Sequence, residues 1–296
     1  MDVMNNINRP ATYKEEVAQY TKKDAIHALL FFAYGVVFLT ANSFFHHSDA
    51  GSEILSTISE MGIIPYTLFR MRTAFFMLVP LFIIVRKKGQ GLRSLGLHLI
   101  EWKKALLAGL FLVAVVPIFT YLPFFSAESQ IHPIEVVITS IVVLLVGALW
   151  EDVVFVGYIQ TRIYGLIKND FWAVIAAGLI FAIMHYPFTI GNFLSGDGVR
   201  FGLGFWNTFA LLNLQWVAMH AVFNFVFREY RSIITVTLFH FSANLAGQPW
   251  RLWEYPSETG FYSLSAFLAE GIGIGIVAVI LITSVFPYIK KRLTEK

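Results

Sequence analysis

Five polar side chains interrupt long apolar stretches of this sequence and are the residues best suited to chemistry. Glu151 and Asp152 lie in LVGALWEDVVFVGYIQ, His185 lies in LIFAIMHYPF, and His240 and Asn244 lie in TLFHFSANL. An unpaired ionisable group inside a bilayer costs on the order of a few kcal/mol, so such groups are rare and usually functional. We therefore take these five residues as the candidate site.

The spacing of these residues predicts that they meet at one depth. Glu151 and His185 each lie seventeen residues from Lys168, near which the chain is expected to turn between two helices. In a pair of antiparallel helices, equal distance from the turn means equal depth. His240 and Asn244 are four residues apart, so both project from one face of a third helix. The pattern predicts a polar cavity inside the membrane.

Together these groups are chemically sufficient for peptide hydrolysis without a serine or cysteine nucleophile. A carboxylate in partly dry surroundings can act as a general base on a water molecule. A histidine beside the carboxylate can share that water and pass protons. A second histidine with an amide side chain can donate hydrogen bonds to the oxyanion of a tetrahedral intermediate. The chain contains no cysteine, which excludes a cysteine nucleophile and a disulfide framework.

Two other interpretations of the same residues stay open. The acids could form a structural pair with neighbouring helices, and the later histidine and asparagine could join helices by hydrogen bonds. His220 and Asn224 repeat the same four-residue spacing, which shows how weak that spacing is alone.

A zinc site is the second chemical alternative. Glu151, His185 and His240 could supply a set of two histidines and one carboxylate, and zinc would activate water in a similar way. However, the sequence has no HExxH pair on one helix. We therefore expect no cofactor, with zinc as the less favoured alternative.

The elements that must position these residues are predicted to be transmembrane helices. The chain has 57% hydrophobic and 14% charged residues, whereas a soluble domain has about a quarter charged residues. Its mean hydropathy is +0.65. We expect an all-α polytopic membrane protein with about eight transmembrane helices and an intramembrane polar cavity. The candidate spans are 25–45, 63–85, 103–125, 133–163, 171–190, 202–227, 232–247 and 262–288.

The basic residues predict the orientation of these spans. They gather in alternate connections and at both ends of the chain, which predicts that both termini are cytoplasmic. The outer connections, including 46–62, carry few basic residues. Arg70 and Arg72 fit this pattern less well, because they lie near the outer part of the second span. We expect a cytoplasmic tail at 1–24, one transmembrane domain at 25–288 and a basic cytoplasmic tail at 289–296.

Three short motifs in this order resemble the CPBP intramembrane proteases, which include type II CAAX-prenyl endopeptidases and Abi bacteriocin-processing and immunity proteins. The family motifs EExxxR, FxxxH and HxxxN match EDVVFV at 151–156, FAIMH at 181–185 and HFSAN at 240–244. The resemblance covers roughly 90–250, including LRSLGL and FREYRSI. Because FREYRSI precedes it at the family's spacing, we prefer the pair at 240 and 244 to the earlier one.

The resemblance implies a role for each candidate residue. Glu151 and His185 would activate water without a metal, and His240 with Asn244 would form the oxyanion hole. Asp152 would support them. The sequence departs from the family at two positions, with Asp152 in place of the second glutamate and Val156 in place of the arginine.

We therefore expect an intramembrane endopeptidase in the plasma membrane of a bacterium. Its partners would be the lipid bilayer and a membrane-associated peptide or protein substrate, with no nucleic acid. The bacterial branch of the family suggests processing of a bacteriocin or signalling peptide. The alternative is a weak or inactive pseudoprotease that acts as a membrane scaffold, a regulatory protein or a bacteriocin-immunity protein. A transporter with a proton-coupled Glu–His pair ranks last, since the chain shows no internal repeat.

Overall fold

The computed structural model describes residues 13–97, 103, 106, 130–194, 205–247 and 253–254. These residues form helices joined by short turns, with one two-stranded antiparallel pairing of Gln130 with Glu254 and Ile131 with Trp253. The elements are α1 (Tyr13–Ala18), α2 (Lys22–His46), α3 (Asp49–Glu60), α4 (Ile63–Arg70), α5 (Arg72–Lys87), η1 (Leu92–Leu95), β1 (Gln130–Ile131), α7 (Ile134–Asp152), η2 (Val153–Gln160), α8 (Thr161–Ile163), α9 (Asp170–Leu194), α10 (Phe205–Tyr230), α11 (Ile233–Gly247) and β2 (Trp253–Glu254).

Four described helices are long and apolar enough to cross a membrane, and a bent pair would make a fifth. The four are Lys22–His46, Ile134–Ile163, Asp170–Leu194 and Phe205–Arg228, which correspond to the first, fourth, fifth and sixth predicted spans. The seventh is a shorter apolar helix over Ile233–Leu245. Predicted spans 103–125, apart from residues 103 and 106, and 262–288 lie outside the described residues. The helical membrane architecture is confirmed, while the total of eight spans stays a prediction.

The second predicted span is broken rather than continuous. α4 and α5 meet at Met71 with a bend of 47°. Arg72 holds the corner, because its guanidinium donates to the Phe69 carbonyl at 2.8 Å and to Asn42 Oδ1 at 2.7 Å and lies 2.6 Å from His46 Nε2. The basic residues that fitted the orientation less well therefore mark a bend.

The outer connection predicted over 46–62 is mostly helical, because α3 occupies Asp49–Glu60. α3 begins after Ser48, whose hydroxyl accepts from the Gly51 backbone N–H at 3.1 Å. A serine at this position followed by Asp49 in the first turn is a typical helix start. Because α3 is short and mostly exposed, it has no long apolar run to reveal it.

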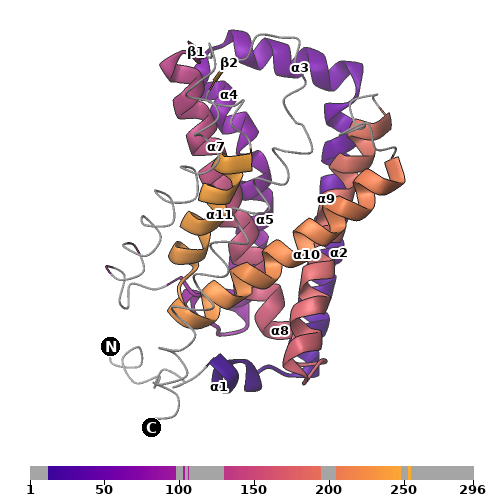
Figure 1. Ribbon diagram of the computed structural model, residues 1–296, viewed down its shortest axis with the longest axis vertical. Helices are drawn as coiled ribbons and strands as arrows, with labels where there is room; N and C mark the ends of the chain where they lie inside the picture. The colour runs from indigo at the N-terminus through magenta and orange to yellow at the C-terminus, as the bar shows by residue number, and fades with distance from the viewer. Residues whose placement is uncertain are drawn as a thin grey trace.

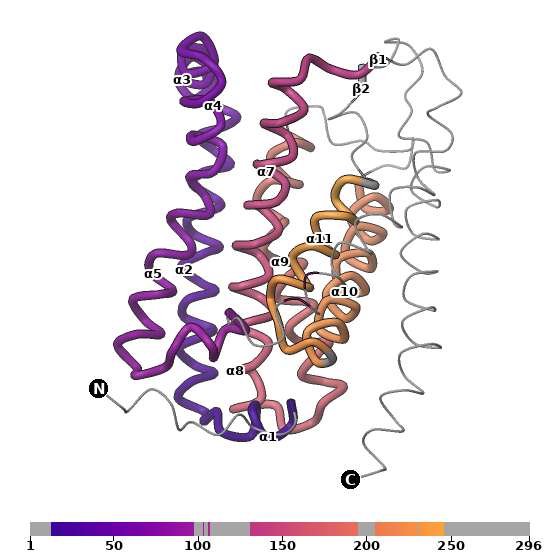
Figure 2. The backbone as a smooth tube through the Cα atoms, turned by 90° about the vertical axis from the view of Figure 1, so that its left-hand side faces the viewer, coloured from indigo at the N-terminus to yellow at the C-terminus, as the bar shows by residue number. Residues whose placement is uncertain are grey.

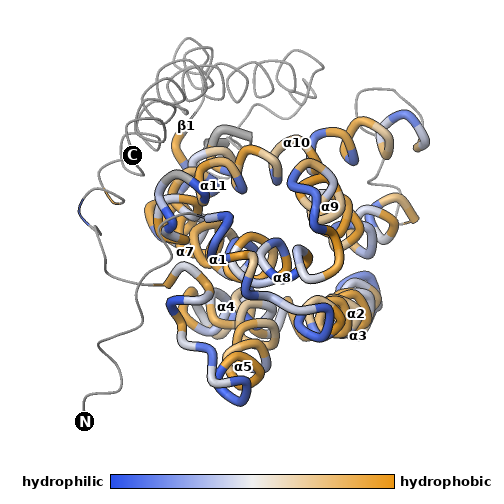
Figure 3. Tube along the Cα trace, turned by 90° about the horizontal axis from the view of Figure 1, so that it is seen from below, coloured by the Kyte–Doolittle hydropathy of each residue, from blue (hydrophilic) through white to orange (hydrophobic). Residues whose placement is uncertain are grey.

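The helices pack as a bundle with α3 lying across its upper end and α1 at its lower end (Figure 1). α9 packs against both α2 and α10, and α7 packs against α11. Viewed from the side, α2, α4 and α5 lie on one flank, α10 and α11 lie on the other, and α7 runs between them (Figure 2). Seen from below, hydrophobic residues dominate α2, α5, α7 and α9 (Figure 3), as expected for helices in contact with lipid.

The described part of the predicted N-terminal tail is a short surface helix that packs on the bundle. Tyr13 of α1 makes edge-to-face contacts with Tyr164 and Phe227. Glu16 is buried and pairs with Arg231, which forms the turn between α10 and α11 with a left-handed φ of 53°. The contacts of α1 thus tie the start of α11 to the lower end of the bundle.

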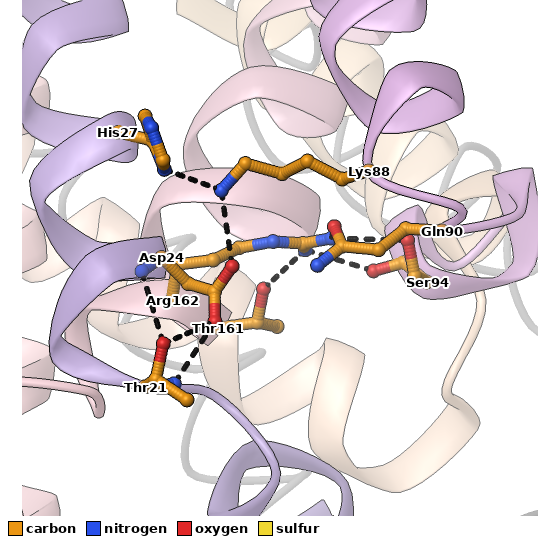
Figure 4. Close-up of polar contacts among 8 residues, drawn as sticks. All are labelled: Thr21, Asp24, His27, Lys88, Gln90, Ser94, Thr161 and Arg162. Atoms are coloured by element: carbon orange, nitrogen blue, oxygen red, sulfur yellow. Dashed lines mark hydrogen bonds and ion pairs between the residues drawn. The ribbon is translucent and has the colours of Figure 1, made fainter.

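A buried arginine fixes the base of the fourth span to η1 (Figure 4). Arg162 is 1% exposed, and its guanidinium donates to the Ser94 carbonyl at 3.0 Å, Gln90 Oε1 at 2.8 Å and the Gly157 carbonyl at 2.9 Å. The aromatic face of Tyr20 lies 4.4 Å from the guanidinium carbon. These contacts hold η1 against η2, the segment that follows the two acids.

Candidate functional site

The two acids lie where the fourth span changes its helical geometry. Glu151 and Asp152 are the last residues of α7, and η2 continues the helix over Val153–Gln160 as a π-helix. Short π-helical stretches within α-helices are frequent at functional sites. The apolar run over 133–163 predicts a single helical span and does not reveal this change, because every residue of η2 is buried and the segment therefore shows no apolar stripe.

His185 lies opposite Glu151, as their equal spacing from the turn predicts. Its Nε2 is 3.9 Å from Glu151 Oε2. Its Nδ1 is 2.8 Å from the Phe181 carbonyl oxygen, which can only accept a hydrogen bond, so Nδ1 carries a proton. In the neutral ring, Nε2 therefore presents a lone pair to the carboxylate. Trp216 of α10 stacks on the imidazole with ring centroids 4.6 Å apart and fixes the ring plane.

His240 reaches both acids from α11. Its Nδ1 is 3.0 Å from Asp152 Oδ1, and its Nε2 is 3.8 Å from Glu151 Oε2. His240 and Asp152 are 2% and 1% exposed. Phe223 packs against the ring with centroids 4.4 Å apart. Asp152 therefore holds one nitrogen of the ring so that the other nitrogen points to Glu151.

The separations around Glu151 Oε2 leave room for a small group. Distances of 3.8 and 3.9 Å to the two Nε2 atoms are too long for direct hydrogen bonds. They are short enough for one water molecule to bond to the carboxylate and to a ring nitrogen at once. Two imidazoles from different helices thus converge on one carboxylate oxygen.

Asn244 and the duplicate pair occupy other positions. Asn244 lies one turn after His240 on α11 and is half-buried. In the part of the chain that the structure describes, it makes none of the contacts that join Glu151 to the two histidines. His220 instead lies 3.1 Å from Gln160 Oε1 through its Nε2 and stacks on Phe181. The structure therefore brings the later histidine, His240, to the acids.

A pocket of about 270 Å³ gives access to Glu151 and His185. Its walls come from α2, the α4–α5 bend, α7, η2 and α9, and they are mostly apolar. Arg70 and Thr189 also line it. No sequence pattern assigns Arg70 to the site, because its position at the pocket depends on the bend at Met71.

Two further observations bear on the chemistry. Among the described residues, no group of three His, Asp or Glu side chains is arranged to hold a metal ion. Val156, at the position of the family arginine, is 1% exposed and belongs to the apolar core. The polar site therefore uses the Asp152–His240 contact without an arginine at that position.

The comparisons with known proteins agree with the residues that form this cluster. No curated protein matches the chain. Residues 133–246 match the family model described as Type II CAAX prenyl endopeptidase Rce1-like. That stretch contains both acids, both converging histidines and Asn244. The match confirms the resemblance drawn from the three motifs, and it is consistent with the wider CPBP family.

Proposed function

We propose that this protein is an intramembrane endopeptidase that hydrolyses a peptide bond in a membrane-associated peptide or protein. The observation that carries this proposal is the convergence of His185 Nε2 and His240 Nε2 on Glu151 Oε2 beside a pocket. The family match over residues 133–246 supports the same class of reaction.

In this mechanism the carboxylate of Glu151 acts as the general base. A water molecule lies between Glu151 Oε2 and His185 Nε2, and its proton moves to the carboxylate as its oxygen attacks the peptide carbonyl carbon. The carbon–nitrogen bond of the tetrahedral intermediate then breaks, and the proton held by Glu151 passes to the leaving amine. The products are one new carboxylate and one new amine, and no covalent enzyme intermediate forms.

His240 stabilises the charge that develops on the carbonyl oxygen. With Nδ1–H donated to Asp152, a ring that carries both protons presents its Nε2–H to the oxyanion. Asn244 contributes a second donor when substrate is bound, since its side chain lies one turn further along the same helix. In this scheme Asp152 is a positioning residue.

The direct test is cleavage in isotopically labelled water. Purified protein in nanodiscs is incubated with a library of apolar peptides in H₂¹⁸O, and the products are analysed by mass spectrometry. A protease of this kind releases products whose new carboxyl group carries one ¹⁸O atom, in a reaction that Glu151→Gln abolishes. If no peptide is cleaved by the parent, or if the variant cleaves equally well, the proposal fails.

We expect hydrolysis to be independent of added or removed metal ions. Glu151 can activate water itself, and among the described residues no three His, Asp or Glu side chains are arranged to hold a metal ion. Treatment with EDTA and with 1,10-phenanthroline should leave the rate of peptide cleavage unchanged. A loss of activity that zinc restores would instead support the alternative in which Glu151, His185 and His240 hold a metal.

Replacing the positioning acid should slow the reaction while leaving the fold intact. In Asp152→Asn the side chain keeps its size but loses the charge that orients His240 from 3.0 Å. By analogy with other His–Asp pairs, we expect kcat to fall by about 10²-fold or more, with little change in KM. Unchanged kcat alongside an unchanged thermal midpoint would remove Asp152 from the mechanism.

The second candidate function is that of a pseudoprotease, favoured by Val156 at the arginine position. A scaffold, regulatory or immunity protein would use the same pocket to bind a membrane partner without turnover. Equal partner binding by the parent protein and by Glu151→Gln, with no cleavage of any peptide, would support this alternative.

We also infer that the protein resides in a bacterial plasma membrane with both termini in the cytoplasm. The connections that follow α5 and α8 carry basic residues, and they support this orientation because the lower ends of both helices lie at the same end of the bundle as α1 (Figure 2). A reporter enzyme that works only in the cytoplasm should be active when it is fused to either terminus, and a reporter that works only outside the cytoplasm should be inactive there.

A further inference from the structure

The pocket at Glu151 extends away from the site toward a cation. Glu151 and Val143 of α7 both line it, and they are separated by eight residues, or about 12 Å of helix. Arg70, the last residue of α4, lines the same pocket. The walls between the carboxylate and the guanidinium include Val143, Val146 and Phe188, so the path between them is apolar.

The level of Arg70 follows from the contact between α4 and α7. Thr67 Oγ1 lies 3.3 Å from Thr139 Oγ1, which aligns the two helices. Both helices descend toward the lower end of the bundle (Figure 2). Arg70 follows Thr67 by three residues, so it lies at about the depth of the α7 residue that follows Thr139 by three. That depth is close to Val143 and roughly two helical turns above Glu151. An extended peptide of a few residues would span that separation.

Arg70 and its neighbour Arg72 differ in the hydrogen-bond partners of their guanidinium groups. Arg72 is engaged by the Phe69 carbonyl, Asn42 and His46 at the bend. Within the ranges that the structure describes, no hydrogen bond or ion pair engages the guanidinium of Arg70, a half-buried residue that lines the pocket. A structural role at the bend thus falls to Arg72, and Arg70 presents its donors to the pocket.

We infer that Arg70 binds a carboxylate of the bound peptide and so determines which substrates are accepted, an inference that rests on the proposed function. A guanidinium matches the two oxygens of a carboxylate and pairs with them strongly where water is scarce. The apolar walls suit the side chains that lie between that carboxylate and the peptide bond at Glu151. The pocket therefore takes an apolar peptide segment with an anionic group at one end.

The inference is tested by binding without turnover. Full-length Glu151→Gln protein in phosphatidylcholine nanodiscs is titrated with a dansyl-labelled apolar tetrapeptide that ends in a free carboxylate, and with the same peptide as a carboxamide. We expect the free acid to bind about 10- to 100-fold more tightly. A further Arg70→Gln substitution should remove this preference, and Arg70→Lys should keep most of it.

Arg86→Gln is the matched control, since Arg86 is an exposed arginine in the last turn of α5, outside the pocket. It should leave the preference unchanged. Equal or absent binding of the two peptides, or a preference that survives Arg70→Gln, overturns the inference. If both peptides bind alike and only anionic phosphatidylglycerol discs respond to Arg70→Gln, a lipid phosphate is the anion and the carboxylate assignment is wrong.

This outcome is separable from the proposed function. A protein that hydrolyses no peptide but retains the Arg70-dependent preference would refute the endopeptidase and keep the anion site. A protein that cleaves peptides in a Glu151-dependent way, with acid and amide forms bound equally, would refute only the role of Arg70.

Discussion

Glu151→Gln is expected to reduce peptide hydrolysis by about 10²- to 10⁴-fold, the usual contribution of a general base. Glutamine has nearly the same shape as glutamate, so the pocket keeps its form, but an amide cannot accept the proton of the attacking water. His185 and His240 would then face a neutral group across the same 3.9 and 3.8 Å. The measurement is the single-turnover cleavage rate of the purified variant against the parent.

Glu135→Gln provides the matched control for this result. Glu135 is in the first turn of the same helix and is exposed, so its carboxylate contacts neither histidine. Its replacement should leave the rate unchanged, and both variants should unfold at temperatures close to that of the parent. A similar loss of rate in both variants would mean that Glu151 has no special role.

Gly157→Ala is expected to destabilise the protein by about 1–3 kcal/mol, as overpacking of a tight core usually does. A Cβ atom at Gly157 would lie 2.5 Å from the carbonyl oxygen of Leu95, closer than van der Waals contact allows. Leu95 belongs to η1, which Arg162 fixes through Ser94, so the backbone there cannot move away freely. Thermal unfolding followed by intrinsic tryptophan fluorescence in detergent measures the change.

Gly147→Ala tests the same substitution where space is available. A Cβ atom at Gly147 of α7 would meet no other atom within 4 Å. Because alanine favours a helix over glycine by up to about 1 kcal/mol, this variant should be as stable as the parent or more so. If Gly157→Ala unfolds at the same temperature as Gly147→Ala, the close approach of η1 to η2 is not a constraint on the fold.

The apolar blocks and the spacing of the polar residues predicted much of the site. Long apolar runs predict the helices over Lys22–His46 and Asp170–Leu194, because a span needs about 20 such residues. The turn near Lys168 predicts that Glu151 and His185 face each other. These inferences succeed because they depend only on helical rise and on the cost of burying charge.

Other parts of the site depend on packing that no sequence pattern reveals. The bend at Met71 brings Arg70 to the pocket, although the apolar run there favours one continuous span. The contact of Asp152 with His240 depends on which face of α11 is turned toward α7. A helix that is apolar on all sides gives no sequence pattern from which that face can be predicted. The guanidinium of Arg162 donates to the Ser94 carbonyl next to η1, a contact that joins residues far apart in the sequence.

The direction in which the Glu151 side chain points depends on the helical geometry of η2 as well as on the side-chain conformation. Each turn with i→i+5 bonding takes up one more residue than an α-helical turn, so rewinding η2 would rotate α7 against α8 by roughly 100° for each residue released. Two hydrogen-bonded contacts oppose that rotation: Asp152 with His240 above η2, and Arg162 with Ser94 below it. Loss of the Arg162–Ser94 contact would therefore rotate the carboxylate of Glu151 away from His185. The change would act at a distance, without altering any atom that touches substrate.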